Sequence, residues 1–223
     1  ILTGLFKKMV VANYLSTLLV DPVFAFPEGQ NVVSAGAAVI GYGIQIYCDF
    51  SGYSDIAIGV ALLLGYRFAR NFNQPYRARG FSDFWRRWHI SLSSWLRDYL
   101  YISLGGNRGG SAKTYRNLLA TMTLGGLWHG AAWNFFLWGI YQGLLLSVHR
   151  ALAGRKVETG TEPQSGIWQV LKRLILIVVF FQVVCYGWLL FRATSFEQIS
   201  DFTAIRLGLK SAPTGLTIPT PPV

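Results

Sequence analysis

Residues 117–149 read NLLATMTLGGLWHGAAWNFFLWGIYQGLLLSVH, a long run that contains no Asp, Glu, Lys or Arg. About 20 apolar residues suffice for a helix to cross the ~30 Å hydrocarbon layer of a membrane. Charge-free apolar runs of this length are typical of membrane segments rather than of soluble domains. The run therefore places the chain among membrane proteins.

Four further stretches continue this pattern. Residues 31–48 and 174–191 contain no charged side chain, and shorter apolar stretches lie at 9–20 and 56–66. Such spacing predicts an all-α, polytopic transmembrane helical bundle. The expected spans are about 9–24, 31–48, 53–66 and 174–191.

The composition agrees with a membrane location. Of the 223 residues, 52% are hydrophobic and 13% are charged, against about 25% charged in a soluble domain. The formal net charge is +10, and in so apolar a chain the basic residues belong in cytoplasmic loops, so no nucleic-acid partner is predicted. Cys48 and Cys185 lie in apolar runs without a Cys-x-x-Cys pair. We interpret both as packing residues and predict neither a disulfide scaffold nor a metal site.

The distribution of charge predicts the orientation of the loops. Residues 67–116 contain ten basic and two acidic side chains, and residues 150–173 contain five basic and two acidic ones. The positive-inside rule places both loops in the cytoplasm. Residues 21–30 contain two acids and no base, so this segment is expected on the opposite side.

The two ends of the chain predict a fragment. Residue 1 is Ile rather than Met, and the final IPTPPV completes no element, so we expect an internal segment, 1–223, of a longer membrane protein. Residues 9–20 follow two lysines and also resemble a secretory signal. No small-residue cleavage site follows them, which makes this the weaker interpretation.

The segment between the two basic loops must enter the membrane and return to the same side. Residues 117–148 give only about 48 Å of helix, too short for two full crossings. The sequence GGLWHG at 125–130 lies near the middle, where glycines can break a helix. A re-entrant hairpin with His129 at its buried tip is the expected result.

A second histidine lies in an amphipathic segment. Residues 84–100 read FWRRWHISLSSWLRDYL and fit one interface helix, capped by Ser82 or Asp83, with tryptophans on one face and arginines on the other. His89 falls on the tryptophan face. For His89 an interface packing role is favoured over a functional one. For His129, an ionisable side chain inside a membrane segment, a functional role and a structural role are equally supported by the residues alone.

The chemistry that these histidines could perform is proton transfer. A neutral imidazole in an apolar setting can remove a proton from a hydroxyl that attacks an acyl carbonyl. The chain contains no Gly-x-Ser-x-Gly, Walker A or His-Glu-x-x-His motif, so hydrolase, NTPase and zinc-protease chemistry are unsupported. Asp49 and Asp55 flank a polar break between two apolar runs. With His129 they leave a second interpretation open, a transporter or proton relay across a broken helix.

Five motifs follow one another along the chain: YCDFSGYSD at 47–55, NFNQPY at 71–76, FWRRWHISLS at 84–93, WLRDYLYISLGGNR at 95–108 and GGLWHGAAWN at 125–134. In this order they resemble the membrane-bound O-acyltransferase family, most closely its bacterial alginate O-acetyltransferase branch. The related teichoic-acid D-alanylation branch shares the Trp-His pairs, but the LGGNR at 104–108 favours the alginate type.

The resemblance implies a multi-pass enzyme of the bacterial inner membrane with His129 as the catalytic histidine and His89 as the second one. It implies that acetyl passes from a cytoplasmic donor, with acetyl-CoA as a candidate substrate and no bound cofactor or metal, to an exported polysaccharide such as alginate. Periplasmic acetyltransferases or other polysaccharide-modification proteins are the implied partners. The residues expected to line or support the substrate channel are Trp85, Trp88, Ser91, Trp95, Asp98, Asn107, Trp128 and Asn134.

Overall fold

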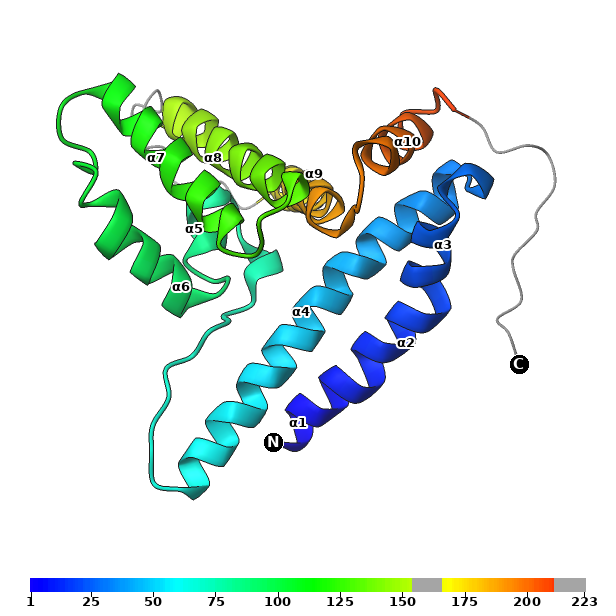
Figure 1. The fold of residues 1–223 in the computed structure, drawn as a ribbon, viewed down its shortest axis with the longest axis horizontal. Helices are drawn as coiled ribbons and strands as arrows, with labels where there is room; N and C mark the ends of the chain where they lie inside the picture. Colours follow the sequence, from blue (N-terminus) through cyan, green and yellow to red (C-terminus); the bar gives the residue numbers. More distant parts are fainter. Residues whose placement is uncertain (154–165, 211–223) are drawn as a thin grey trace. The chain divides into compact units, whose positions relative to one another are not determined.

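The computed structural model describes residues 1–153 and 166–210, and every regular element among them is helical (Figure 1). This confirms the all-α class. The chain divides into two compact units, one made of Ile1–Phe68 with Trp188–Val223 and the other of Ala69–Gly187. The loop predicted at 150–173 lies partly outside the described residues.

The first unit begins with one unbroken helical stretch, which alternates between α-helical and π-helical hydrogen bonding. The backbone stays helical at every junction, so the predicted span at 9–24 lies inside this stretch. Its segments are α1 (Leu2–Leu5), η1 (Phe6–Ala12), α2 (Asn13–Leu15), η2 (Ser16–Val20) and α3 (Asp21–Ala25).

The longest helix, α4 (Val32–Leu63), follows the short turn η3 (Pro27–Gly29). Asn31 caps its start: its side chain accepts hydrogen bonds from the backbone N–H groups of Val33 and Ser34, both at 2.9 Å. The Ser34 hydroxyl in turn accepts from the Asn31 N–H, which completes a capping box. At the other end Gly65 adopts a left-handed conformation with φ +84°, and such a residue ends a helix.

The continuity of α4 corrects one expectation. The sequence suggested two spans, 31–48 and 53–66, separated by a polar break, but the structure has a single 32-residue helix. The polar residues do not break it because both carboxylates are neutralised from η1. Lys8 Nζ lies 2.5 Å from an oxygen of Asp49, and Lys7 Nζ lies 2.8 Å from one of Asp55.

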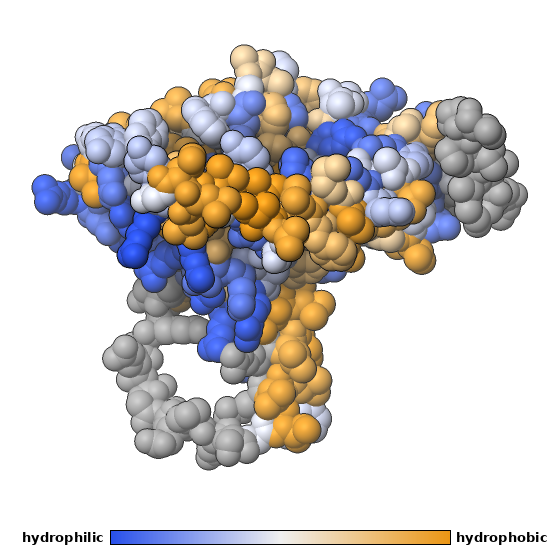
Figure 2. Space-filling view, turned by 90° about the horizontal axis from the view of Figure 1, so that it is seen from below, coloured by the Kyte–Doolittle hydropathy of each residue, from blue (hydrophilic) through white to orange (hydrophobic). Residues whose placement is uncertain are grey.

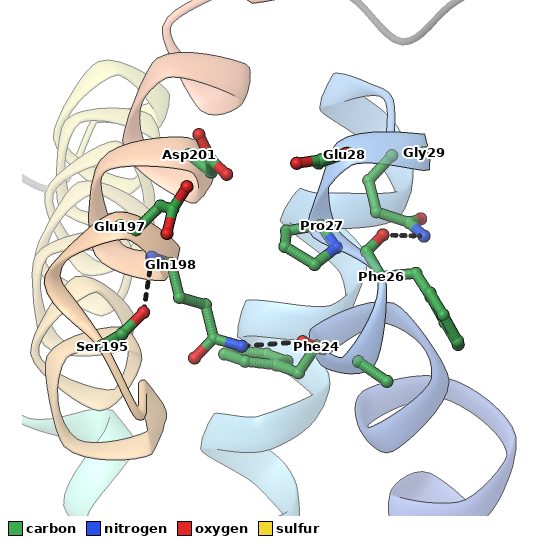
Figure 3. Close-up of a pocket in the computed structure, with 11 residues that line it drawn as sticks. Phe24, Phe26, Pro27, Glu28, Gly29, Ser195, Glu197, Gln198 and Asp201 are labelled. Atoms are coloured by element: carbon green, nitrogen blue, oxygen red, sulfur yellow. Dashed lines mark hydrogen bonds between the residues drawn. The ribbon is translucent and has the colours of Figure 1, made fainter.

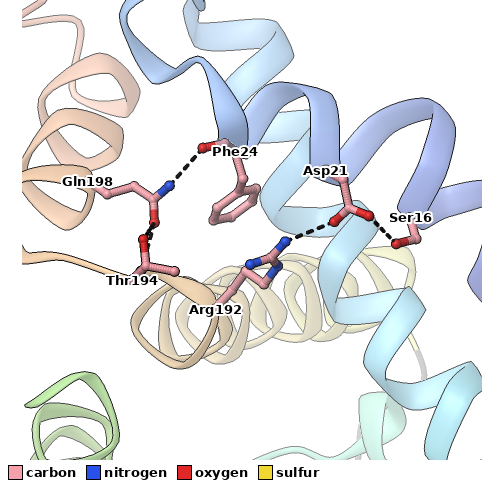
Figure 4. Close-up of polar contacts among 6 residues, drawn as sticks. All are labelled: Ser16, Asp21, Phe24, Arg192, Thr194 and Gln198. Atoms are coloured by element: carbon pink, nitrogen blue, oxygen red, sulfur yellow. Dashed lines mark hydrogen bonds and ion pairs between the residues drawn. The ribbon is translucent and has the colours of Figure 1, made fainter. Parts of the chain in front are cut away.

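The C-terminal part of the first unit is attached to the start of the chain (Figure 4). Arg192, at the end of α9 (Ile167–Arg192), donates to Asp21 at 2.8 Å, and its guanidinium lies 5.4 Å from the Phe24 ring centroid. Helix α10 (Phe196–Arg206) follows, and Gln198 donates from its side chain to the Phe24 carbonyl at 2.7 Å. The Phe202 ring stacks on Phe24 with centroids 4.4 Å apart.

The second unit is organised around a hairpin of α7 (Ser111–Leu127) and α8 (Trp133–Ala153). The two helices run antiparallel and are in contact through glycine. A Cβ on Gly139 would lie 2.6 Å from the Met122 carbonyl oxygen, and one on Gly126 would lie 3.0 Å from the Cα of Gly139 and clash with the Phe135 carbonyl. Such close backbone approach through small residues is typical of helix pairs in membranes.

This hairpin is longer than the sequence suggested. It begins at Ser111 and ends at Ala153 rather than spanning 117–148. Helix α7 starts inside the predicted loop 67–116, and helix α8 ends inside the predicted loop 150–173. With 17 and 21 residues, the arms are about 26 and 32 Å long. The length argument for a re-entrant hairpin therefore fails, and the depth of the hairpin in the membrane stays a prediction.

Two of the described helices are long and apolar enough to cross a membrane, Val32–Leu63 and Val170–Arg192. The second contains the predicted span 174–191. Many of the large apolar side chains on α4 and α9 are exposed in the described chain, and they contribute to the orange surface in Figure 2. Lipid is the natural environment for such side chains in a membrane protein.

Candidate active site

The two candidate histidines both lie where the backbone leaves helical geometry. His89 lies between α5 (Phe81–Trp85) and α6 (Ile90–Trp95), which η5 (Leu96–Tyr101) continues. Its backbone is left-handed, with φ +41°. A non-glycine residue in this region is uncommon and strained, and such residues concentrate at functional sites.

This break corrects the prediction of one helix over residues 84–100. The first helix starts after Gly80 and shows no side-chain cap from Ser82 or Asp83. The segment does not continue as a helix because the neighbouring loop at residues 71–73 bonds to its backbone groups. Asn73 N–H donates to the Arg87 carbonyl and Ile90 N–H donates to the Asn71 carbonyl, both at 2.9 Å.

Asn71 holds the residues that follow His89. Its side-chain oxygen accepts from the Ser91 hydroxyl at 2.6 Å and from the Ser91 backbone N–H at 3.2 Å. The same Ser91 oxygen lies 3.5 Å from Nδ1 of His89. Because the Ser91 hydroxyl proton points to Asn71, its oxygen can accept from a protonated Nδ1. That tautomer leaves Nε2 as the basic nitrogen.

The structure brings the two histidines into electrostatic contact. Burial, followed by the positive charge that His129 can carry, lowers the pKa of His89 to about 4. A charge on one ring therefore disfavours a charge on the other. His89 stays neutral at physiological pH and keeps a lone pair available as a base.

His129 lies in the turn between α7 and α8, where its N–H donates to the Gly126 carbonyl at 3.0 Å. Aromatic rings surround its imidazole. The ring centroids of Trp128, Trp138 and Phe135 lie 5.0, 5.5 and 6.1 Å from that of His129. The residue itself is exposed in the described chain, so a substrate can reach the ring.

Four other predicted residues belong to the surroundings of the histidines. Trp85 packs edge-on against Trp138 at 5.9 Å, which connects α5 to the rings around His129. Trp88 is buried and stacks on Phe84 at 5.7 Å. The Trp128 ring centroid lies 5.0 Å from that of His129, and the Ser91 hydroxyl oxygen lies 3.5 Å from Nδ1 of His89.

For three other predicted residues, Trp95, Asp98 and Asn134, the contacts described do not involve either histidine. Trp95 is exposed and packs on Tyr99 at 5.7 Å. Asp98 forms an ion pair with the adjacent Arg97 at 2.7 Å. Asn134 lies in the first turn of α8, shortly after the turn that contains His129. The role of these three residues at the channel stays a prediction.

Asn107 lies in a glycine-rich loop and holds two other side chains there by hydrogen bonds. Its side-chain oxygen accepts from the Tyr101 hydroxyl and from the Arg150 guanidinium, the latter at 3.1 Å. The four glycines around it have positive φ, which L-amino acids with side chains seldom adopt. They are Gly105, Gly106, Gly109 and Gly110. The loop motif is thus explained by backbone conformation.

Sequence reasoning missed two residues of the site, Asn71 and Trp138. Asn71 was quoted within the NFNQPY motif, but nothing in its local pattern shows that it binds a residue 20 positions later. Trp138 lies in the apolar run that forms α8, and from the sequence alone it is indistinguishable from an ordinary core residue. The spacing of Trp138 from Asn134, one helical turn, is the only local signal for it.

A separate cavity of about 540 Å³ lies in the first unit, between η3 and the start of α10 (Figure 3). Its acidic lining residues are Glu28, Glu197 and Asp201, and none of the described residues that line it is a histidine. Proton abstraction at neutral pH favours an imidazole over exposed carboxylates. The candidate active site is therefore the histidine pair of the second unit.

The chain belongs to the membrane-bound O-acyltransferase family, which it matches over residues 7–188. Among its relatives is the probable alginate O-acetylase AlgI of Azotobacter vinelandii, 46% identical over 87% of this chain and 36% of that protein. The AlgI protein of Pseudomonas aeruginosa is 47% identical over 87% and 35% of the two chains. The peptidoglycan O-acetyltransferase of Helicobacter pylori is 42% identical over 87% and 35%.

These matches confirm the family resemblance and the membrane-bound character of the chain. The chain spans about a third of the length of these relatives.

Proposed function

We propose that the chain forms the catalytic part of a multi-pass inner-membrane O-acyltransferase that delivers acetyl groups to an exported polysaccharide. The observation that carries this proposal is the family match over residues 7–188, which includes both His89 and His129, two residues of the same compact unit. The names of the relatives, alginate O-acetylase and peptidoglycan O-acetyltransferase, support a polysaccharide acceptor.

The proposed reaction is acyl transfer assisted by a histidine base. A hydroxyl of the acceptor attacks the carbonyl carbon of the acetyl donor while a ring nitrogen of His129 takes the hydroxyl proton. The bond between the carbonyl carbon and the leaving group then breaks, and the leaving group receives the proton. A positioned base contributes about 10²- to 10⁴-fold to such a step.

The donor and partners are part of the same proposal. An activated acetyl donor such as acetyl-CoA approaches from the cytoplasm, where the basic loop at 67–116 is predicted to lie. A periplasmic acetyltransferase or another polysaccharide-modification protein receives or uses the acetyl group. Alginate is the proposed acceptor, and peptidoglycan is the first alternative polymer to test.

The transporter interpretation is not favoured. Its two carboxylates, Asp49 and Asp55, each form an ion pair with a lysine of η1. These ion pairs account for both carboxylates as contacts between α4 and η1, and the family match supports acyl transfer instead.

A labelled donor separates the two functions. The full-length protein in vesicles, given acetyl-CoA with a labelled acetyl group and alginate on the opposite side, should produce labelled acetyl ester on the polymer. Parallel vesicles with peptidoglycan test the second acceptor. Label that crosses the membrane but stays unesterified on every acceptor would contradict acyl transfer and support transport.

A further inference from the structure

A second cavity, of about 530 Å³, lies in the unit that contains the histidines. Three arginines line it, Arg77, Arg79 and Arg87, together with Gln74, Asp83 and Ile177. Among these described lining residues Asp83 supplies the one carboxylate, so they leave two positive charges uncompensated. From this geometry we infer that the cavity binds a phosphate-bearing ligand through its arginine side chains.

Part of the cavity lining comes from the turn at residues 74–79, which leaves two arginines exposed. Gln74 has a left-handed backbone with φ +48°, and η4 (Pro75–Arg77) follows it. Pro75 and Ala78 are buried, whereas Arg77 and Arg79 are exposed. The buried residues thus fix the turn, and the arginines are left at the cavity.

Each arginine is held differently. Arg77 donates to the side-chain oxygen of Gln74 at 2.8 Å. Arg87 donates from Nε to Asp83 at 2.8 Å and from Nη1 to the Asn73 carbonyl at 3.3 Å. Among residues 1–153 and 166–210, the Arg79 guanidinium has neither a hydrogen-bond nor an ion-pair partner. Asp83 therefore orients Arg87 and leaves Arg79 available to an anion.

Guanidinium groups select phosphate for a geometric reason. Their planar fork offers parallel N–H donors that match two oxygens of one phosphate. Three such groups around a cavity larger than a single phosphate suit a diphosphate or a phosphate joined to a larger group. The ligand is either a soluble phosphate compound or the headgroup of an anionic lipid, since Ile177 places the cavity beside α9, a candidate membrane span.

Binding can be measured without acyl transfer, so the test stands independently of the proposed function. The full-length protein in phosphatidylcholine nanodiscs is titrated with inorganic pyrophosphate by calorimetry, and His129→Ala should bind it as the wild type does. We expect Arg79→Gln and Arg77→Gln to weaken binding at least about tenfold, the loss typical of one charge-assisted contact. Arg79→Lys should restore part of it.

A matched control and a second arm complete the experiment. Arg70→Gln removes a basic residue of the same stretch that does not line the cavity, and it should leave binding unchanged. In the second arm the protein is purified from phosphatidylglycerol-containing vesicles, and the retained lipid is quantified by mass spectrometry.

Pyrophosphate binding that depends on Arg79 supports a soluble ligand. Phosphatidylglycerol retention that depends on Arg79 supports a lipid headgroup. If Arg77→Gln and Arg79→Gln change neither quantity while the variants elute as folded protein, the site does not exist as described.

Discussion

The side chain of Asn71 accepts two hydrogen bonds from Ser91, one from its hydroxyl at 2.6 Å and one from its backbone N–H at 3.2 Å. This pair fixes the backbone directly after the strained His89 and orients the hydroxyl that faces its imidazole. Asn71 is therefore a positioning residue that acts through Ser91.

Asn71→Ala should lower acetyl transfer at least about tenfold per molecule of protein, because Ser91 loses its acceptor and His89 its orientation. Asn71→Asp, which keeps an oxygen at the same place, should retain most of the activity. Asn73→Ala is the matched control, since Asn73 contributes only backbone groups to the described hydrogen bonds. Equal losses in Asn71→Asp and Asn71→Ala would argue against the positioning role.

His89→Gly tests whether the strain at His89 serves function. Glycine adopts positive φ without steric cost, so the thermal midpoint should stay the same or rise while transfer is lost. His89→Asn should keep stability, since Asn tolerates this region, and it should also be inactive. A large fall in the midpoint of His89→Gly with normal transfer per molecule would assign His89 to packing.

The lowered pKa of His89 predicts a specific pH response. A histidine with a pKa of about 4 is neutral at pH 5.5, whereas an ordinary one with a pKa near 6.5 is mostly protonated there. Diethyl pyrocarbonate modifies only the neutral ring, so modification of the His89 peptide, measured by mass spectrometry, should slow only below about pH 5. Slowing centred near pH 6.5 would show that His89 is not buried as described.

His129→Ala should reduce transfer at least about a hundredfold, because it removes the base. The protein should still accumulate in the membrane, since His129 is an exposed residue in the turn between α7 and α8. His149→Ala provides the contrast. His149 packs edge-on against Phe81 at 6.2 Å and lies against Gly80, so this variant should lower the amount of protein and leave transfer per molecule unchanged. Wild-type transfer by His129→Ala would refute the assignment.

Gly126→Ala and Gly139→Ala should destabilise the hairpin of α7 and α8 by about 1–3 kcal/mol each, because the added methyl group meets backbone atoms that cannot move aside. The measurement is the thermal midpoint of the detergent-purified protein. Gly36→Ala in α4 is the control, since no described atom lies within 4 Å of the position that its Cβ would take, and it should be neutral or stabilising. Unchanged midpoints for Gly126→Ala and Gly139→Ala would mean that the helices do not approach this closely.

The sequence predicted the elements that depend on local pattern. The charge-free run around His129 indicated the α7 and α8 hairpin, and the capping residue Asn31 begins α4 where the apolar run begins. The failures have a common physical origin in contacts between distant residues. The helix expected over 84–100 breaks because Asn71 and Asn73 bind its backbone, and the break expected in α4 is absent because lysines more than 40 positions away neutralise Asp49 and Asp55.

The sequence indicated two candidate histidines but not the geometry around them, and their catalytic roles stay a prediction. Motif spacing indicated both His89 and His129, but a helical projection placed His89 on a tryptophan face that does not exist as one helix. The left-handed backbone of His89 and its electrostatic contact with His129 result from packing, which no local pattern encodes.

The unbroken length of α4 has a consequence for how the protein sits in lipid. A helix of 32 residues is about 48 Å long, well beyond the ~30 Å thickness of the hydrocarbon layer. Its last residues, Leu62 and Leu63, are apolar and exposed in the described chain, so an upright α4 would leave these two leucines in water instead of lipid. Tilting α4, or thickening the bilayer locally around it, relieves this hydrophobic mismatch.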